Sequence, residues 1–260
     1  MSTLKLEGRT AIVTGGLQGI GRSIAKELTE MGAKVAIGAR RGGDTELAAQ
    51  AAEFVGGKPL IRHLDICDGA SVADFTGEVR SSLGPVDILV NAAGKTILQP
   101  VTGHTDEDWD EMLNINLSGV FRMIRACMPD MIEAKRGRIV NVGSTAAKVA
   151  AATHPAYCAA KAGVLGLTKA VAIEGAPHGI TCVSVSPAWV ETDMLRYAAS
   201  KLAEASGRTQ EDEIAIMGQS NPQGRLIQPE EIAALVGFCC TDAAKGLTME
   251  DLQVNAGALW

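Results

Sequence analysis

A tyrosine and a lysine stand four residues apart in the stretch HPAYCAAKAG, which runs from His154 to Gly163. If the stretch is helical, Tyr157 and Lys161 share one face of the helix. A free tyrosine has a pKa of about 10, which is too high for a base near neutral pH. We expect the Lys161 ammonium group to lower the pKa of Tyr157, so that the tyrosine acts as a general acid or base. The structural alternative is a helix whose small side chains let a neighbouring helix pack closely.

A glycine-rich turn follows the first predicted strand. The stretch TGGLQGIGR, Thr14–Arg22, has Gly15, Gly19 and Gly21 where the strand turns into a helix. A dinucleotide pyrophosphate has to approach bare backbone N–H groups and the positive end of a helix, and a Cβ atom would obstruct it. The spacing is G-x-x-x-G-x-G rather than G-x-G-x-x-G. The turn indicates a dinucleotide-binding site, with a tight strand-to-helix turn as the alternative.

The residues after the second predicted strand indicate which dinucleotide binds. NAD-binding folds usually have an acidic residue here that holds the ribose hydroxyl groups. This chain instead has Ala39, Arg40 and Arg41. A carboxylate would repel a 2′-phosphate group, whereas a guanidinium group binds it through paired hydrogen bonds. The sequence therefore favours NADP(H) over NAD(H), the alternative being two arginines that only face solvent.

The elements that must position these residues alternate between strand and helix. Runs rich in Val and Ile predict buried strands, and the intervals between them have helical spacing. We therefore expect a doubly wound, Rossmann-type α/β three-layer sandwich with a central, mostly seven-stranded parallel sheet. The predicted strands are 10–14, 34–39, 60–64, 86–90, 138–142, 180–185 and 252–254, and the predicted helices are 20–31, 44–55, 71–83, 106–131, 155–175 and 229–240.

No linker, repeat or low-complexity tract divides the chain, so we expect one domain over residues 1–260. The interval Glu191–Gly224 is the least regular part, because it is polar and long and contains Gly207, Gly218 and Pro222. A long excursion at this point of an α/β sheet often covers a site. The interval 191–224 is therefore predicted to be a substrate lid.

The composition disfavours several classes of protein. Hydrophobic residues make up 47% of the chain and charged residues 21%, a balance typical of a globular protein. The net charge of −6 argues against a general affinity for nucleic acid or an anionic membrane. The sequence has no signal-peptide pattern at its start and no apolar run long enough to span a membrane. Six cysteines and four histidines without metal-ligand spacing predict no metal site and free thiols in a reducing cytoplasm.

Several motifs, in their order along the chain, resemble those of the short-chain dehydrogenase/reductase family in its single-domain form. They are TGGLQGIG at 14–21, NAAG at 91–94, NINLSG at 114–119, NVGS at 141–144, YCAAK at 157–161 and SPAWVET at 186–192. The resemblance covers nearly the whole chain and implies a catalytic tetrad of Asn116, Ser144, Tyr157 and Lys161. Tyr157 would be the general acid/base, with its pKa lowered by Lys161 and by the positive charge of oxidised nicotinamide. Ser144 would donate a hydrogen bond to the substrate oxygen. Lys161 would also bind the nicotinamide ribose, and Asn116 would hold a water molecule of a proton relay.

The same resemblance implies which residues contact the cofactor. Asp65 resembles the adenine contact, whereas Val190 and Thr192 resemble the residues that hold the nicotinamide carboxamide. The full expected set is Gly15, Leu17, Gln18, Gly19, Ile20, Gly21, Arg40, Arg41, Asp65, Ile66, Asn91, Ala92, Gly94, Tyr157, Lys161, Pro187, Val190 and Thr192.

Four positions depart from the family pattern. Ala92 replaces the second asparagine of Asn-Asn-Ala-Gly, and Ala188 replaces the glycine of Pro-Gly, which adds a Cβ atom near the nicotinamide. Met249 stands where the family has the glycine of Thr-Gly, and Asn255-Ala256 stands where Asp-Gly is common. None of these positions belongs to the tetrad.

The resemblance implies an NAD(P)(H)-dependent oxidoreductase that interconverts a secondary alcohol and a ketone by hydride transfer, assembled as a homotetramer or homodimer. Three alternatives stay open: an NAD-dependent catabolic alcohol dehydrogenase, an epimerase or dehydratase with a retained nicotinamide, and a cofactor-binding regulator without turnover. Trp189 and Met194 predict an apolar wall for the small-molecule substrate. Lys95 or Lys148 could bind an anionic group, the alternative being solvated surface lysines. These residues do not separate a steroid, a sugar, an acyl thioester or a small cyclic ketone.

Overall fold

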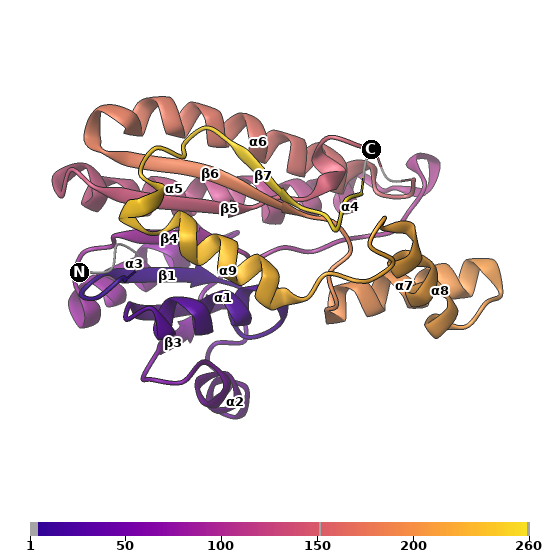
Figure 1. The fold of residues 1–260 in the computed structure, drawn as a ribbon, viewed down its shortest axis with the longest axis horizontal. Coiled ribbons are helices and arrows are strands. Elements are labelled where there is room, and N and C mark those ends of the chain that lie inside the picture. Colours follow the sequence, from indigo (N-terminus) through magenta and orange to yellow (C-terminus); the bar gives the residue numbers. More distant parts are fainter. Residues whose placement is uncertain (1–4, 151, 259–260) are drawn as a thin grey trace.

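The computed structural model describes residues 5–150 and 152–258. Within them, seven strands form one sheet in the order β3-β2-β1-β4-β5-β6-β7, with every neighbouring pair parallel (Figure 1). The strands are β1 Thr10–Thr14, β2 Lys34–Ala39, β3 Leu60–His63, β4 Ile88–Asn91, β5 Gly137–Val142, β6 Ile180–Pro187 and β7 Asp251–Val254. The predicted Rossmann-type α/β fold is confirmed, and the strand ends differ from the expected ones by at most two residues.

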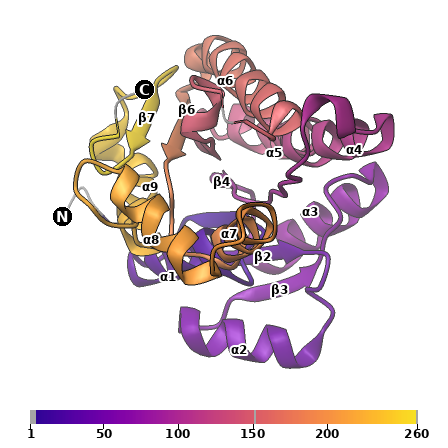
Figure 2. The ribbon, with the colours of Figure 1, turned by 90° about the vertical axis from the view of Figure 1, so that its right-hand side faces the viewer.

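Helices cover both faces of the sheet, as Figures 1 and 2 show. One face carries α1, α2 and α9, and the other carries α3, α5 and α6, with α4 leading into α5. The helices are α1 Gly19–Glu30, α2 Thr45–Val55, α3 Gly69–Leu83, α4 Asp106–Leu113, α5 Gly119–Glu133, α6 Pro155–Gly175, α7 Asp193–Ser206, α8 Gln210–Ser220 and α9 Pro229–Cys239. Short 3-10 turns lie at Val101–Gly103, Thr145–Ala147, Ala176–His178 and Asp242–Ala244.

The central strands are buried over their whole length, which explains why their sequences are continuous apolar runs. Every residue of β1, β4, β5 and β6 is buried. One apolar cluster fills the layer between the sheet and α1, α2 and α9, and a second fills the layer toward α3, α5 and α6. Helices on both faces leave no solvent-facing side for polar residues. The carboxyl ends of these strands are therefore fixed points from which a site can be built.

The helix predicted over residues 106–131 is present but is not uniform. A π-helical turn, Asn114–Ser118, joins α4 to α5 and contains Asn116. The amide nitrogen of Asn116 donates to the carbonyl oxygens of Lys95 and Met112, so its side chain ties the turn to the loop after β4. π-helical turns of this kind occur frequently at functional sites.

The prediction of an irregular segment over residues 191–224 is wrong, because α7 and α8 occupy most of it. Thr192 caps α7, and Thr209 and Asp212 form a capping box at the start of α8. The two helices pack on each other around a small apolar cluster that includes Leu195 and Met217. They lie beyond the carboxyl ends of the strands, on the side that faces the viewer in Figure 2.

One stretch of the described residues, Pro155–His178, is long and apolar enough to cross a membrane by length and composition alone. This stretch contains α6, and α6 packs along β6, β5 and the π-helical turn in the three-layer sandwich. The core helix of a globular protein passes the same test. The apolar character of α6 is therefore explained by its place against the sheet.

Candidate active site

The strand order reverses between β1 and β4, because the chain first builds the sheet outward to β3 and then returns to add β4 on the other side of β1. In doubly wound folds the crevice at this reversal, at the carboxyl ends of the strands, is the place where ligands bind. Two cavities of about 290 Å³ and 180 Å³ lie there. They adjoin, because five residues line both: Ile20, Ala92, Gly94, Thr192 and Met194.

The glycine turn fits a dinucleotide pyrophosphate. Helix α1 has no side-chain cap at Gln18 and no acidic residue in its first turn, so its first N–H groups and its positive dipole end are not neutralised. The start of the helix, from Gln18 to Gly21, lines the larger cavity. A Cβ atom on Gly21 would lie 2.5 Å from the Gly15 carbonyl oxygen, and one on Gly15 would lie 2.8 Å from Ala93 Cα. Gly19 has a φ of +53°, which favours glycine. The turn therefore requires glycine and leaves an anion-binding helix end open.

The two cavities bring nearly all the expected cofactor contacts together. The larger cavity is lined by Gly15, Leu17, Gln18, Gly19, Ile20, Gly21, Arg40, Arg41, Asp65, Ile66, Ala92, Gly94 and Thr192. The smaller cavity is lined by Tyr157, Lys161, Pro187 and Val190. The Thr14 hydroxyl accepts hydrogen bonds from the Ala92 and Ala93 N–H groups, which holds the NAAG turn against the glycine turn.

Asn91 is the expected cofactor residue that the structure does not bring to either cavity. It ends β4 and is buried, and its amide nitrogen donates to Asn141 Oδ1 at 2.9 Å. Asn141 in turn donates to Thr168 Oγ1. The side chain of Asn91 thus joins β4 to β5 and α6, and its part in the site is to place the turn that follows it.

The arginines expected to select NADP(H) lie at the rim of the larger cavity. Arg40 and Arg41 are exposed and follow β2 directly, and Arg41 forms an ion pair with Asp44 at 3.4 Å. Asp44 also caps α2. The backbone carbonyl of Arg40 contacts His63 Nδ1 at 2.8 Å, which fixes the end of β2. Ala39 ends β2, at the position where NAD-binding folds usually have an acidic residue.

Lys161 lies deep beside Tyr157, on the same face of α6 as the sequence predicts. Its side chain is 6% exposed, and Nζ donates to the Val142 carbonyl oxygen at 2.7 Å. Nζ is 5.6 Å from the centre of the Tyr157 ring. Burial lowers the pKa of Lys161 to about 8, because a desolvated ammonium group is less stable.

The expected lowering of the Tyr157 pKa by the Lys161 ammonium group is not found. Burial raises the pKa of Tyr157 above its ordinary value, and the Ser144 hydroxyl offsets only part of that rise. The sequence argument counted the charge of Lys161 but could not count the desolvation of the phenol between α6 and the end of β5. The raised pKa therefore favours the protonated phenol at neutral pH.

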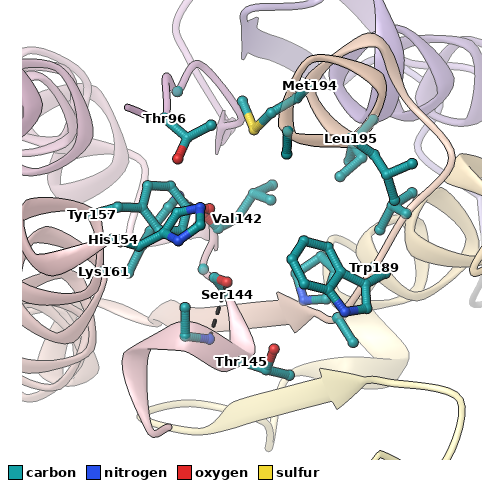
Figure 3. Close-up of a pocket in the computed structure, with 18 of the residues that line it drawn as sticks. Thr96, Val142, Ser144, Thr145, His154, Tyr157, Lys161, Trp189, Met194 and Leu195 are labelled. Carbon is teal, nitrogen blue, oxygen red and sulfur yellow. Dashed lines mark hydrogen bonds between the residues drawn. The ribbon is translucent and has the colours of Figure 1, made fainter. Parts of the chain in front are cut away.

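Ser144 follows β5 and begins the 3-10 turn Thr145–Ala147. Its oxygen accepts a hydrogen bond from the Ala146 N–H at 3.1 Å, drawn as a dashed line in Figure 3. Because that bond uses a lone pair, the hydroxyl hydrogen stays available for a ligand in the smaller cavity. Ser144 can therefore donate a hydrogen bond beside Tyr157.

Asn116 is fully buried and acts on the backbone. Its amide nitrogen donates to Lys95 O at 2.9 Å, and its Oδ1 accepts from Lys95 N at 3.2 Å. A Cβ atom on Gly94 would lie 3.0 Å from Asn116 Oδ1 and 4.0 Å from Lys161 Nζ. Ser144, Tyr157 and Lys161 thus line the smaller cavity, and Asn116 lines neither cavity but holds the loop that follows β4.

The smaller cavity has one polar and one apolar side. Figure 3 places Thr96, Tyr157, His154 and Ser144 on one side, and Met194, Leu195 and Trp189 opposite them. The apolar wall expected from Trp189 and Met194 is confirmed. Lys148 pairs with Asp251 at 2.8 Å and does not line either cavity, whereas Lys95 lines the larger cavity and pairs with Glu111.

The sequence argument missed several lining residues. Thr96 and Cys67 each stand two positions beyond a residue that the motifs identify, so counting onward from Gly94 and Asp65 would have found them. Val149 and Leu195 carry no such signal, because only the folding of the loop after β5 and of α7 brings them to the cavity. Residues 5–150 and 152–258 hold no cluster of three His, Cys, Asp or Glu side chains that could bind a metal ion.

Comparisons with known proteins agree with this site. A family model described as short chain dehydrogenase matches residues 9–203. The chain is 39% identical over 251 residues to a "Monensin polyketide synthase putative ketoacyl reductase" of Streptomyces virginiae, with 96% of each chain covered. It is 38% identical over 257 residues to the 3-oxoacyl-[acyl-carrier-protein] reductase FabG of Escherichia coli (strain K12), with 98% of each covered.

Among solved structures, a variant of the actinorhodin polyketide ketoreductase with NADPH superimposes with a TM-score of 0.92 at 33% identity, covering 96% of this chain and 97% of that one. The crystal structure of gox2181 superimposes with a TM-score of 0.88 at 35% identity, covering 98% and 97%. Fold, motifs and site geometry therefore agree: the chain is an enzyme of the short-chain dehydrogenase/reductase family.

Proposed function

We propose that this enzyme is an NADP(H)-dependent oxidoreductase that reduces a ketone to a secondary alcohol. The convergence of Ser144, Tyr157 and Lys161 on the smaller cavity, which adjoins the larger one, supports this most directly. The larger cavity has the open helix end for the dinucleotide pyrophosphate, and the smaller cavity is lined both by the expected nicotinamide contacts and by the apolar wall for a ketone. The relatives' names describe reductases of ketoacyl and oxoacyl groups, which favours the direction of reduction.

The side chains divide the chemistry of reduction among them. NADPH, when bound, supplies the hydride. The Ser144 hydroxyl donates a hydrogen bond to the ketone oxygen and stabilises the charge that develops there. Tyr157 gives its proton to that oxygen, which becomes the alcohol hydroxyl, and its raised pKa keeps it in the protonated form that reduction needs. Lys161 lies behind the ring and stabilises the phenolate that the proton leaves behind.

The preference for NADP(H) over NAD(H) rests on the charge at the end of β2. Arg40 and Arg41 stand where a 2′-phosphate would lie, at the rim of the larger cavity. The relative solved with NADPH agrees with this choice.

We further propose that α7 and α8 form the lid over the substrate cavity, that the chain assembles as a homotetramer or homodimer, and that it works in the cytoplasm. Its six cysteines are all free thiols, as the last of these proposals requires.

Cofactor absorbance at 340 nm, followed over a panel of ketones and secondary alcohols, tests the proposal. We expect net consumption of NADPH with a ketone and net formation with the matching alcohol. Product formed without any net change in NADPH would instead indicate an epimerase or dehydratase. Cofactor binding without turnover over the whole panel would indicate a regulator.

A further inference from the structure

Two polar side chains of the smaller cavity take no part in the mechanism above. Thr96 is 8% exposed, and its Oγ1 has no hydrogen-bond partner among the described residues. A buried hydroxyl group without a partner is costly, so native structures rarely retain one without a reason. Thr96 lines the cavity, and Figure 3 shows its oxygen on the same side as Tyr157 and His154. A ligand that fills the cavity can supply a partner for this hydroxyl group.

His154 presents a hydrogen-bond acceptor to the same cavity. Its ring is buried, lines the cavity and lies edge-on to Tyr157, with 6.3 Å between the ring centres. Nδ1 lies 2.9 Å from the Ala152 carbonyl oxygen, which can only accept, so Nδ1 carries the hydrogen atom. In a neutral imidazole this leaves Nε2 with a free lone pair. Nε2 has no hydrogen bond to any residue in the described part of the chain.

Both side chains stand on loops that are tied together. Asn116 holds the backbone of Lys95, next to Thr96, through two hydrogen bonds. The Gln99 N–H then donates to the Thr153 carbonyl oxygen at 2.8 Å, which joins this loop to the one that carries His154. Thr153 has a φ of +66°, a strained conformation for a β-branched residue. The two loops therefore hold Thr96 and His154 in place before any ligand arrives.

We propose that Thr96 and His154 form a subsite for a hydroxyl group of the substrate, next to the carbonyl that Tyr157 protonates. A hydroxyl group can donate to His154 Nε2 and accept from the Thr96 hydroxyl, whereas a carbonyl or ether oxygen can only accept. The opposite side, with Trp189, Met194 and Leu195, takes the hydrocarbon part. The substrate class is thus a hydroxyketone with an apolar body, an assignment that rests on the proposed ketone reduction.

The test compares two ketones that differ in one hydrogen-bond donor. The probes are 2-hydroxy-1-phenylethanone and its methyl ether, 2-methoxy-1-phenylethanone, which keep the phenyl group for the apolar wall. Their dissociation constants are measured by NMR titration of the protein without nicotinamide, so that the readout does not depend on turnover. We expect the hydroxyketone to bind about five- to tenfold more tightly, the change expected for one neutral hydrogen bond.

Substitutions at Thr96 and His154 test whether these two side chains form the proposed hydrogen bonds. Thr96→Val keeps the shape and removes the hydroxyl group, and His154→Phe keeps a ring beside Tyr157 and removes the acceptor. His154→Phe is expected to bring the ratio of the two dissociation constants close to one. Thr96→Val removes a donor from which the hydroxyl and the ether oxygen can both accept, so it is expected to weaken both ketones by a similar factor. Thr96→Ser and His154→Gln keep the polar atoms and are expected to retain part of the preference. His178→Phe, the same change beyond the far end of α6, is the matched control and is expected to keep the wild-type ratio.

Four results would overturn the subsite: a wild-type ratio near one, a preference that survives in His154→Phe, affinities for both ketones that Thr96→Val leaves unchanged, or no binding of either ketone. The absorbance test of ketone reduction is separate. If the hydroxyketone binds with the expected preference but NADPH is not consumed, the proposed function is wrong and the subsite stands. If NADPH is consumed without any such preference, the proposed function stands and the subsite is wrong.

Discussion

At the scale of single residues, the chemistry depends on the environment of two side chains. Tyr157 and Lys161 are partners by spacing, but desolvation shifts both away from their charged forms. The pKa of the tyrosine rises and that of the lysine falls. The pair therefore starts as a protonated phenol beside a lysine that is close to its own titration point at neutral pH, an arrangement suited to donating a proton to a ketone.

Replacement of Tyr157 tests this assignment. Tyr157→Phe removes the proton donor and keeps the ring, so we expect kcat for ketone reduction to fall by about 10²- to 10⁴-fold. Cofactor affinity should change little, because the tyrosine hydroxyl is not what holds the dinucleotide. The measurements are steady-state rates at 340 nm and cofactor titration. Wild-type kcat in this variant would refute the role of Tyr157.

Arg40→Asp tests the cofactor preference. The change removes a guanidinium group and adds the carboxylate that would repel a 2′-phosphate. We expect kcat/KM for NADPH to fall by about 10- to 100-fold while kcat/KM for NADH holds or rises. Lys58→Asp, the same change of charge at an exposed position that lines neither cavity, serves as the control. A wild-type enzyme that prefers NADH would contradict the preference.

Lys161 makes a testable contribution to stability. Its pKa is about 8 in the folded chain and 10.5 in the unfolded chain, so below pH 8 it is charged in both states and burial costs the fold on the order of 3 kcal/mol. Between pH 8 and 10.5 that cost disappears as the folded-state amine loses its proton.

Lys161→Met should therefore lose activity but unfold at a higher denaturant concentration than wild type at pH 7, and this difference in midpoint should shrink toward pH 10. The lost bond to Val142 O reduces the gain by about 1 kcal/mol. Equal midpoints at pH 7 would show that burial of the ammonium group is not costly.

At the scale of elements, two departures from the family pattern carry backbone strain. Met249 and Ala256 stand where the family commonly has glycine, and both have positive φ, +67° and +49°. An L-residue in the left-handed region costs about 1–2 kcal/mol. The turn before β7 and the turn after it therefore each contain a left-handed residue that is not glycine.

Met249→Gly is expected to stabilise the protein by about 0.5–1 kcal/mol, since the relief of strain exceeds the entropy that glycine adds to the unfolded chain. The side chain is 41% exposed, so little packing is lost. Ala170→Gly, at an exposed position inside α6, should destabilise by about 1 kcal/mol and is the control. Denaturant unfolding measures both. A destabilised Met249→Gly would show that this turn is not strained.

At the scale of the whole molecule, stability is unevenly distributed. The two large apolar clusters join the sheet to its helix layers, whereas α7 and α8 share only the small cluster around Leu195 and Met217. Elements with few buried apolar contacts open at lower free energy than the core. The proposed lid is thus expected to open at lower free energy than the sheet.

Hydrogen exchange tests this view of the lid. We expect the amides of α7 and α8 to exchange faster than those of β4 and β5 in the free protein, and to slow when NADP⁺ is added. The control is the second half of α5, residues 126–133, which lines neither cavity and whose exchange should not change to the same extent. Lid amides that are as slow as those of the sheet without ligand would contradict a moving lid.

The amino-acid sequence by itself determined the order of strands and helices, the glycine turn and the pairing of Tyr157 with Lys161, because these depend on periodicity and on residues close along the chain. Tertiary structure alone decided the rest. It turned residues 191–224 into two capped helices, buried Asn91 away from the cofactor cavity, raised the pKa of Tyr157, and brought Thr96 and His154 to one cavity wall. Burial and the meeting of distant loops depend on how the whole chain packs, and local patterns do not encode them.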